Sequence, residues 1–366
     1  MFSSSSILTV DLAAIQANWR YVASSLKNNA ECAAVVKADA YSVGAEEVAK
    51  ALYLAGCRSF YLATVEEAVV LRMILPADAI LYVLGGVRLG AEPSFAELRL
   101  IPVLYSLAEI KHWSEFCASI CAALPCVIKV DTGMTRLGLR LSDLDEFLQM
   151  AANHFSLNPI LIMSHLACAD EPGHPLNTRQ LQQFEKAVAK TKVFFPQIKT
   201  SLANSSATFL GEEFHFDMVR IGAALYGINP QRDRPNPLQP AITLKLSVLQ
   251  IRLLETDVSV GYGAAASAKA GTRLAVVAGG YADGIHRTLG LSPRGMVNGQ
   301  MVPAVGRISM DSCVFDISAV AADPEYIEVM NEQISLDSLI AHNNFLGYEV
   351  LTSLGRRYLR RYLGKV

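Results

Sequence analysis

The chain has 366 residues, 52% of them hydrophobic, which is more than one ordinary domain contains and enough to bury a large core. Its 32 basic and 34 acidic side chains are spread through the sequence and give a formal net charge of -2. This balance excludes the strong positive field that nucleic-acid binding requires. We therefore expect two globular units and a small-molecule partner.

The N-terminal segment MFSSSSILTVDL has no Lys or Arg before its apolar run, and Asp11 interrupts that run, so it lacks the pattern of a signal peptide. No stretch approaches the roughly 18 apolar residues of a membrane span. The seven cysteines have no CxxC spacing, which is typical of free thiols in a reducing compartment. Cys117 and Cys121 are one helical turn apart, but no histidine completes a metal site there. We predict a cytoplasmic protein with no membrane segment and no metal.

From about residue 30 to 230, short runs of apolar, often β-branched residues alternate with stretches of helical periodicity. This alternation is typical of βα units. In chain order the predicted strands are 33–38, 59–64, 79–86, 100–106, 125–133, 159–167, 199–204 and 218–227. The predicted helices between them are 45–56, 65–75, 108–120, 144–153 and 178–191.

Eight strands of nearly continuous apolar character favour a closed parallel (β/α)8 barrel of the TIM type, because both faces of such a sheet are covered. An open, doubly wound sheet is the alternative architecture. No GxGxxG follows the first predicted strand, so a dinucleotide-binding version of that alternative has no support.

The composition changes near residue 231, where QRDRPNPLQP is polar and rich in proline, as in a linker. The runs that follow are strand-like and are separated by glycine and Asn-Gly turns, which predicts a smaller, mainly β domain. We expect that domain to end in a basic helix over 351–362. The predicted domains are 1–235 and 236–366.

Polar residues at the ends of the predicted strands are the candidates for chemistry, because active sites of parallel barrels lie at the C-terminal ends of the strands. Lys37 follows Val35 and Val36, so burial would lower the pKa of its amine and let it form an imine with an aldehyde. A lysine whose amine reaches out to solvent is an equally good interpretation of this residue alone.

Other strand ends add further candidates for this site. Arg136 and His165 supply a cation and a titratable imidazole after two successive strands, and Tyr41 lies in the loop after Lys37. The last two strands are followed by groups suited to a phosphate cup of hydroxyls and backbone amides, namely Asn204, Ser205, Ser206, Arg220, Gly222 and Ala223. Each of these residues taken singly also fits an ordinary structural role.

In the predicted β domain, several candidates lie in turn-like settings. Tyr262 and Tyr281 each lie next to glycine, in VGYGAA and GGYADG, and a phenol can act as an acid or a base. Met310 lies in GRISMD and Tyr348 in FLGYEVLT. Ordinary loop chemistry is the alternative interpretation of all four.

Nine motifs, taken in order, resemble those of the alanine racemase family and span about 320 residues. They are VVKADAY, KVDTGMTRLG, SHLACADE, LANSSA, RIGAALYG, GYGAA, GYADG, GRISMD and YEVLTSLGRRYLRRY. The resemblance implies an N-terminal (β/α)8 barrel, a C-terminal β domain and a head-to-tail homodimer with shared active sites. It also implies pyridoxal 5′-phosphate as the cofactor, L-alanine and D-alanine as substrates, and the supply of D-alanine for peptidoglycan.

The resemblance further implies two proton-transfer residues on opposite faces of the substrate. Lys37 matches the lysine that holds the cofactor as an imine and handles the α-proton of D-alanine. Tyr262 matches the base that handles the α-proton of L-alanine in the partner subunit's site. Removal of a proton from one face and delivery to the other requires two such groups.

The remaining roles implied by the resemblance concern binding. Arg220 matches the residue facing the pyridine nitrogen, His165 the group that hydrogen-bonds this arginine, and Arg136 the partner of the phenolic oxygen and a substrate contact. Met310 and Tyr281 match a carboxylate contact and part of the entry gate. The family's contacts to the cofactor phosphate match Tyr41, Ser205, Gly222, Ala223 and Tyr348. Asn204, next to Ser205 in the chain, is a further expected cofactor-binding residue. Lys129 matches a lysine that is carbamylated in some members.

The chain departs from the family pattern at two places. Ser42 and Val43 replace part of a usual glycine-histidine-glycine turn, and Ser309 stands where a cysteine is common. Three other functions remain as alternatives: a racemase of broader specificity, a decarboxylase on the same barrel, and a non-catalytic carrier of the cofactor. Arg220 argues against the decarboxylase, which usually has an acidic group there, and Tyr262 within a β domain argues against the carrier.

Overall fold

A computed structural model describes residues 6–27, 29–153, 156–287, 294–340 and 346–364. Contacts divide the chain into two compact units. We call them the barrel unit, Ile15–Ala40 with Gly44–Leu238, and the β unit, Met1–Ala14 with Tyr41–Val43 and Gln239–Val366.

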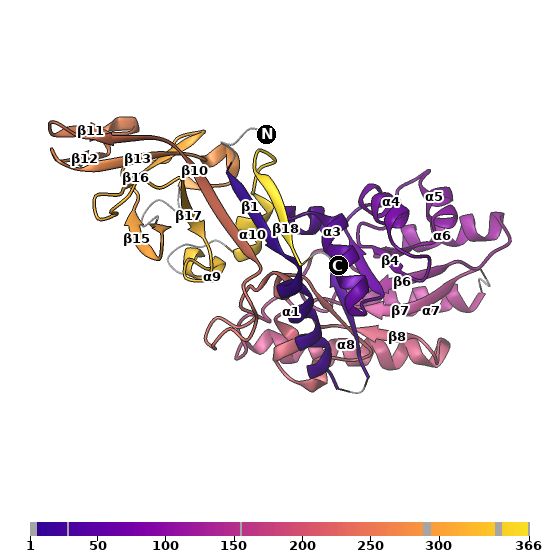
Figure 1. Ribbon diagram of the computed structural model, residues 1–366. Coiled ribbons are helices and arrows are strands. Elements are labelled where there is room, and N and C mark those ends of the chain that lie inside the picture. Colours follow the sequence, from indigo (N-terminus) through magenta and orange to yellow (C-terminus); the bar gives the residue numbers. More distant parts are fainter. Residues whose placement is uncertain (1–5, 28, 154–155, 288–293, 341–345, 365–366) are drawn as a thin grey trace. The chain divides into compact units, whose positions relative to one another are not determined.

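The barrel unit contains eight parallel strands (Figure 1), which confirms the predicted barrel. They are β2 (Glu31–Val35), β3 (Ser59–Leu62), β4 (Ile80–Val83), β5 (Leu100–Leu104), β6 (Pro125–Lys129), β7 (Asn158–Met163), β8 (Lys199–Ser201) and β9 (Met218–Ile221). Neighbours pair in the order β8-β7-β6-β5-β4-β3-β2-β9. The ring closes between β9 and β8, where Asp217 N donates to Thr200 O and Arg220 N to Ala203 O, both at 3.0 Å.

Helices cover the outside of these strands (Figure 1). They are α1 (Leu12–Ser25), α3 (Ala45–Ala55), α4 (Val65–Ile74), α5 (Glu92–Glu97), α6 (Leu107–Ser119), α7 (Leu144–Asn153) and α8 (Pro175–Phe194). The alternating pattern predicted five of them, α3, α4, α6, α7 and α8. Side chains fill the interior of the barrel, including Tyr61 and Tyr82, whose rings stack 4.5 Å apart. The barrel is therefore a packed core, and its functional groups lie at the strand ends.

The β unit is built around the long strand β10 (Ile242–Leu253), which pairs with β1 (Ile7–Asp11), β13 (Arg273–Ala278) and β17 (Tyr326–Met330) (Figure 1). Its other strands are β11 (Val258–Val260), β12 (Ala266–Ala268), β14 (Arg294–Val297), β15 (Gln300–Pro303), β16 (Ser312–Asp316) and β18 (Leu359–Leu363). Two short helices, α9 (Leu336–Ile340) and α10 (Gly347–Thr352), complete it. Leu8, Leu246 and Ile327 are fully buried in its core.

The two ends of the chain differ from the sequence interpretation. The predicted N-terminal domain begins at residue 1, yet β1 pairs antiparallel with β10 and parallel with β18, so the first strand belongs to the β unit. The basic helix expected over 351–362 is wrong: α10 ends at Thr352, and Leu359–Leu363 is the strand β18. This strand satisfies the backbone groups on the edge of β1 that β10 leaves open.

None of the helices within the described residues is long and apolar enough to cross a bilayer.

Candidate active site

Lys37 follows β2 and begins α2 (Lys37–Ser42), a turn of unusual handedness. Residues 38 to 42 all have φ between 51° and 67°, which is the left-handed region. For residues other than glycine this conformation costs roughly 1–2 kcal/mol each, so it persists only where the surroundings hold it. Asp39 helps to hold it, because its Oδ1 accepts a hydrogen bond from Ala45 N at 2.8 Å.

Glu67, in the first turn of α4, holds the same segment from the helix that follows the neighbouring strand β3. Its Oε1 accepts a hydrogen bond from Ala38 N, the residue after the lysine, and its Oε2 accepts one from Ala63 N, both at 2.8 Å. Burial lowers the pKa of the Lys37 amine, as does the positive charge of Arg136, while Glu67 opposes them. Lys37 is therefore a half-buried amine with a weakened hold on its proton.

Arg220, on β9, is 4% exposed and held by acceptors from two strand ends. Its Nη2 donates to Ser164 O at 2.7 Å and to Leu202 O at 3.3 Å, and its Nη1 donates to the Ser201 hydroxyl. Burial lowers the pKa of the guanidinium to about 10, so it still carries its charge at neutral pH. A guanidinium has only N–H donors, so Arg220 can donate a hydrogen bond to a ring nitrogen that faces it. Because it keeps its proton at neutral pH, it does not protonate that nitrogen.

His165, at the end of β7, lies between Arg220 and Asn204. Its Nδ1 is 3.5 Å from Arg220 Nη2, and its Nε2 is 3.5 Å from Asn204 Nδ2. Burial, and then the charge of Arg220, lowers the pKa of the imidazole well below 6.5. The imidazole is therefore neutral at neutral pH, as an acceptor for the arginine must be.

Lys129 and Arg136 add two more cations at this end of the barrel. Lys129, the last residue of β6, is 7% exposed, and burial together with Arg136 and Arg220 lowers the pKa of its amine to about 8. Arg136 is exposed on the loop that follows β6. Asp131 shapes this loop, because its Oδ1 accepts hydrogen bonds from the backbone N–H groups of three successive residues, 133 to 135, at 2.9–3.1 Å.

Ser205 lies between the last two strand ends and organises the predicted phosphate cup. Its buried Oγ accepts hydrogen bonds from Gly222 N at 2.9 Å and from Ala224 N at 3.2 Å, beside the short turn Ala223–Tyr226. With its lone pairs facing these amides, the hydroxyl directs its own proton elsewhere. The structure thus brings together Asn204, Ser205, Gly222 and Ala223, as the sequence predicted.

The other predicted residues belong to the β unit. Tyr41 is half-buried, and burial and then Tyr348 raise the pKa of its phenol, which places these two tyrosines near each other. Tyr262, Tyr281 and Met310 are 71%, 43% and 52% exposed. They extend from turns of this unit toward solvent in the single chain.

Sequence reasoning missed several residues that hold the site. Gln180, fully buried on α8, donates to His165 O at 2.9 Å and to Thr132 Oγ1 at 3.3 Å, and its Oε1 accepts from Ala167 N at 2.9 Å. It therefore joins the loops after β6 and β7. Nothing local in the sequence marks it. Glu67 had a signal, because Thr64-x-x-Glu67 has the form of a helix capping box.

The chemical character of the barrel site follows from its charge. Four positive charges lower the pKa values of the two lysines and of His165, namely those of Lys37, Lys129, Arg136 and Arg220. Two acidic groups oppose them: Glu67 raises the pKa of Lys37, and Asp131 raises that of Lys129. Among the described residues, no group of three His, Cys, Asp or Glu side chains is arranged to hold a metal. The site therefore suits an anionic organic molecule that reacts with an amine.

Comparison with protein families agrees with this arrangement. The model of the alanine racemase N-terminal domain matches residues 10–230, and the model of the C-terminal domain matches residues 241–362. The alanine racemase of Rhodospirillum rubrum is 44% identical over 365 residues, which cover 99% of this chain and 96% of the relative. A catabolic alanine racemase of Agrobacterium fabrum is 39% identical, covering 97% of this chain and 92% of the relative.

Solved structures give the same result. The alanine racemase of Bartonella henselae, with covalently bound pyridoxal phosphate, has a TM-score of 0.91 and 37% identity, covering 98% of this chain and all of that one. The biosynthetic alanine racemase of Pseudomonas aeruginosa has a TM-score of 0.88 and 32% identity, with 98% and 99% coverage. Both family models match, and relatives match over almost the whole length, so the chain belongs to the alanine racemase family.

Proposed function

We propose that this protein interconverts L-alanine and D-alanine with pyridoxal 5′-phosphate as its cofactor. The observation that carries the proposal is the group of four cationic residues at the C-terminal end of the barrel, Lys37, Lys129, Arg136 and Arg220, in which burial lowers the pKa of both lysine amines. This is the chemistry needed to hold an anionic aldehyde through its carbonyl carbon, its phenolic oxygen and its phosphate.

The residues present fit the cofactor group by group. Ser205, with the backbone at Gly222 and Ala223 and next to Asn204 in the chain, offers a hydroxyl and amides to a phosphate. We assign Tyr41 and Tyr348 of the β unit to the same phosphate. Arg136 provides a cation for the phenolic oxygen, and Arg220 a donor for the pyridine nitrogen, oriented by His165. When bound, pyridoxal phosphate delocalises the electron pair left behind as the α-proton leaves.

Two residues of this chain move the proton in our proposal. Lys37, once exchanged for the substrate amine, removes or returns the α-proton on one face, and its lowered pKa makes its neutral form available. Tyr262 does the same on the opposite face. Arg136 and the backbone amide of Met310 bind the substrate, and Tyr281 forms part of its entry gate. Lys129 is the residue that would carry a carbamate beside Arg136.

We infer that the active enzyme is a homodimer in which the β unit of one subunit serves the barrel of the other. The support is the exposure of Tyr262, whose side chain is 71% exposed in the single chain although it is a proposed base. A proton-transfer group needs a water-poor, fixed position, which an exposed turn acquires only against a partner.

The cellular role we propose is the cytoplasmic supply of D-alanine for peptidoglycan. All seven cysteines are free, as in a reducing compartment. The relatives carry both roles in their names, biosynthetic in Pseudomonas aeruginosa and catabolic in Agrobacterium fabrum. Deletion of the gene distinguishes them, because the biosynthetic role predicts growth only with added D-alanine.

The activity is tested with the purified enzyme and two variants. Lys37→Ala should abolish both the visible absorbance of bound pyridoxal phosphate and the formation of D-alanine from L-alanine. Tyr262→Phe should retain the absorbance and lose at least about 10²-fold in rate, as removal of a general base does. A wild-type protein with neither absorbance nor turnover would refute the proposal. Rates with serine, lysine and arginine separate alanine racemisation from a broader specificity.

A further inference from the structure

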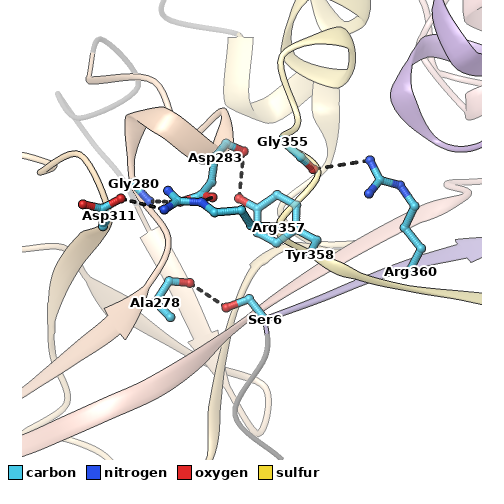
Figure 2. A network of polar contacts seen from close by, with 9 residues as sticks. All are labelled: Ser6, Ala278, Gly280, Asp283, Asp311, Gly355, Arg357, Tyr358 and Arg360. Carbon is cyan, nitrogen blue, oxygen red and sulfur yellow. Dashed lines mark hydrogen bonds and ion pairs between the residues drawn. The ribbon is translucent and has the colours of Figure 1, made fainter. Parts of the chain in front are cut away.

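Three segments of the β unit meet at one side chain, Arg357 (Figure 2). The first is 279–284 and contains Tyr281, the second is 309–311 and contains Met310, and the third is 355–358. Tyr281 and Met310 are the proposed substrate residues of this unit. The contacts between the segments therefore decide how the Tyr281 side chain and the Met310 backbone amide are presented.

The first two segments lie directly against each other through their backbones. Gly279 N donates to Asp311 O at 3.0 Å, Tyr281 N to Ser309 O at 3.1 Å, and Ala282 N to Met310 O at 3.0 Å. A Cβ atom at Gly280 would lie 2.3 Å from the carbonyl oxygens of both Ser309 and Met310, so only glycine permits this approach.

Arg357 joins both segments through their carboxylates (Figure 2). Its Nε and Nη2 donate to the two oxygens of Asp283 at 2.6 and 2.7 Å, and its Nη1 donates to Asp311 Oδ1 at 2.7 Å. The three bonds use the planar fork of a guanidinium, which a lysine ammonium cannot reproduce. One side chain thus ties the segment of Tyr281 to the segment of Met310.

The two carboxylates differ in how much they depend on this arginine. The side chain of Asp283 is 5% exposed, and that of Asp311 is 64% exposed. Asp283 Oδ2 also accepts from Gly280 N at 3.0 Å, and its backbone oxygen accepts from Tyr358 Oη at 2.9 Å. Removal of Arg357 would leave a buried carboxylate without its counter-charge, whereas loss of the Asp311 carboxylate would release only the second segment.

We propose that Arg357 is a positioning residue for substrate binding, which acts by fixing Tyr281 and Met310 relative to each other. The inference rests on the proposed function, in which these two residues meet the substrate. Arg357 itself touches neither the substrate nor the cofactor. Its loss therefore lowers the affinity for alanine and leaves the cofactor attached to the barrel.

The test uses the cofactor-loaded enzyme with Arg357→Lys and Asp311→Ala, separately and combined. We expect each single variant to raise KM for alanine about tenfold while kcat changes less than about twofold, because uniform binding is lost. The double variant should be no worse than the poorer single variant, since both break one connection. The absorbance of the bound cofactor should be unchanged in all three.

Arg273→Lys is the matched control. Arg273 also pairs with an aspartate of the β unit, Asp323, and donates to Val320 O at 2.6 Å, but it contacts neither segment. Its variant should keep the wild-type KM. If Arg357→Lys is poorly folded, Asp311→Ala alone still decides the matter, because that side chain is exposed.

A wild-type KM in Asp311→Ala and in a folded Arg357→Lys would overturn the proposal, as would an equal rise in KM in Arg273→Lys. These results differ from a failure of the proposed function, in which the wild-type enzyme itself would show no cofactor absorbance and no racemisation.

Discussion

Single residues of the barrel site have their charge states set by burial and by one another. Arg220 keeps its charge with a pKa of about 10, and His165 beside it is kept neutral. The neutral imidazole is the consequence of a fixed cation next to it, because a second positive charge there would be repelled and poorly solvated. An arginine oriented in this way can only donate to a ring nitrogen.

The state of His165 predicts a pH dependence of stability. Its pKa is well below 6.5 in the folded protein, while the unfolded chain takes up a proton near pH 6.5. The unfolded state therefore binds more protons below that pH, and stability falls as the pH falls. Between about pH 7.5 and about pH 5.5 we expect His165 to account for a loss of about 1 kcal/mol in the free energy of unfolding.

Urea unfolding of wild type and His165→Gln at these two pH values measures this contribution. The variant should lose less stability on acidification than the wild type. An identical loss in both proteins would show that His165 titrates normally in the folded state.

Two helices of the barrel, α4 and α6, each use one carboxylate to connect successive βα units. Glu67 in α4 accepts from Ala63 N at the end of its own strand and from Ala38 N after the preceding one. Glu109 in α6 does the same with Tyr105 N and Val87 N, at 2.9 and 2.8 Å. One carboxylate per helix thus satisfies backbone donors of two neighbouring strand ends.

This arrangement predicts that Glu67→Gln destabilises the barrel. Glutamine has one acceptor oxygen, so one of the two backbone N–H groups would face another donor, at an expected cost of about 1–3 kcal/mol. Because Glu67 also opposes the lowering of the Lys37 pKa, the variant should hold that amine's proton less tightly.

Urea unfolding measures the stability of this variant. Glu66→Gln is the control, since this neighbouring carboxylate is exposed and should change the stability by less than about 0.5 kcal/mol. Equal effects of the two substitutions would argue against a special role for Glu67.

At the scale of the whole molecule, the proposed site needs residues from two units of different character. In our proposal the barrel unit supplies most of the cofactor residues, and the β unit supplies Tyr41 and Tyr348 and presents Tyr262 and Met310 on exposed turns. A symmetric dimer with shared sites completes two such sites at once.

Mixing inactive variants tests this arrangement. Lys37→Ala and Tyr262→Ala subunits, unfolded and refolded together in equal amounts, should form half mixed dimers, each with one intact site of two. Activity should then return to about a quarter of the wild-type value, as random pairing in a symmetric dimer requires. No recovery, with mixed dimers demonstrated by a tag on one variant, would show that each site is built from one chain.

Much of the fold could be predicted from local pattern, because strands of a covered parallel sheet are apolar throughout and helices repeat every 3.6 residues. The eight strands, five of the helices between them and the polar residues at the strand ends follow from this. So does the position of Lys37 after β2, and the lowered pKa of its amine follows from its apolar neighbours.

The rest was decided by contacts between residues far apart in the chain. The strand β1 joins the β unit because β10 and β18 offer backbone partners, and β18 is a strand and not a helix for the same reason. The left-handed turn after Lys37, the second bond of Glu67 and the triple contact of Arg357 likewise depend on which segments meet. By itself, the sequence determined the barrel, the strand-end residues and the family motifs, since these depend on local periodicity and residue type. Only the tertiary structure decided how Arg357 joins Asp283 to Asp311, because hydrogen-bond geometry across 46 and 74 residues of chain has no local signature.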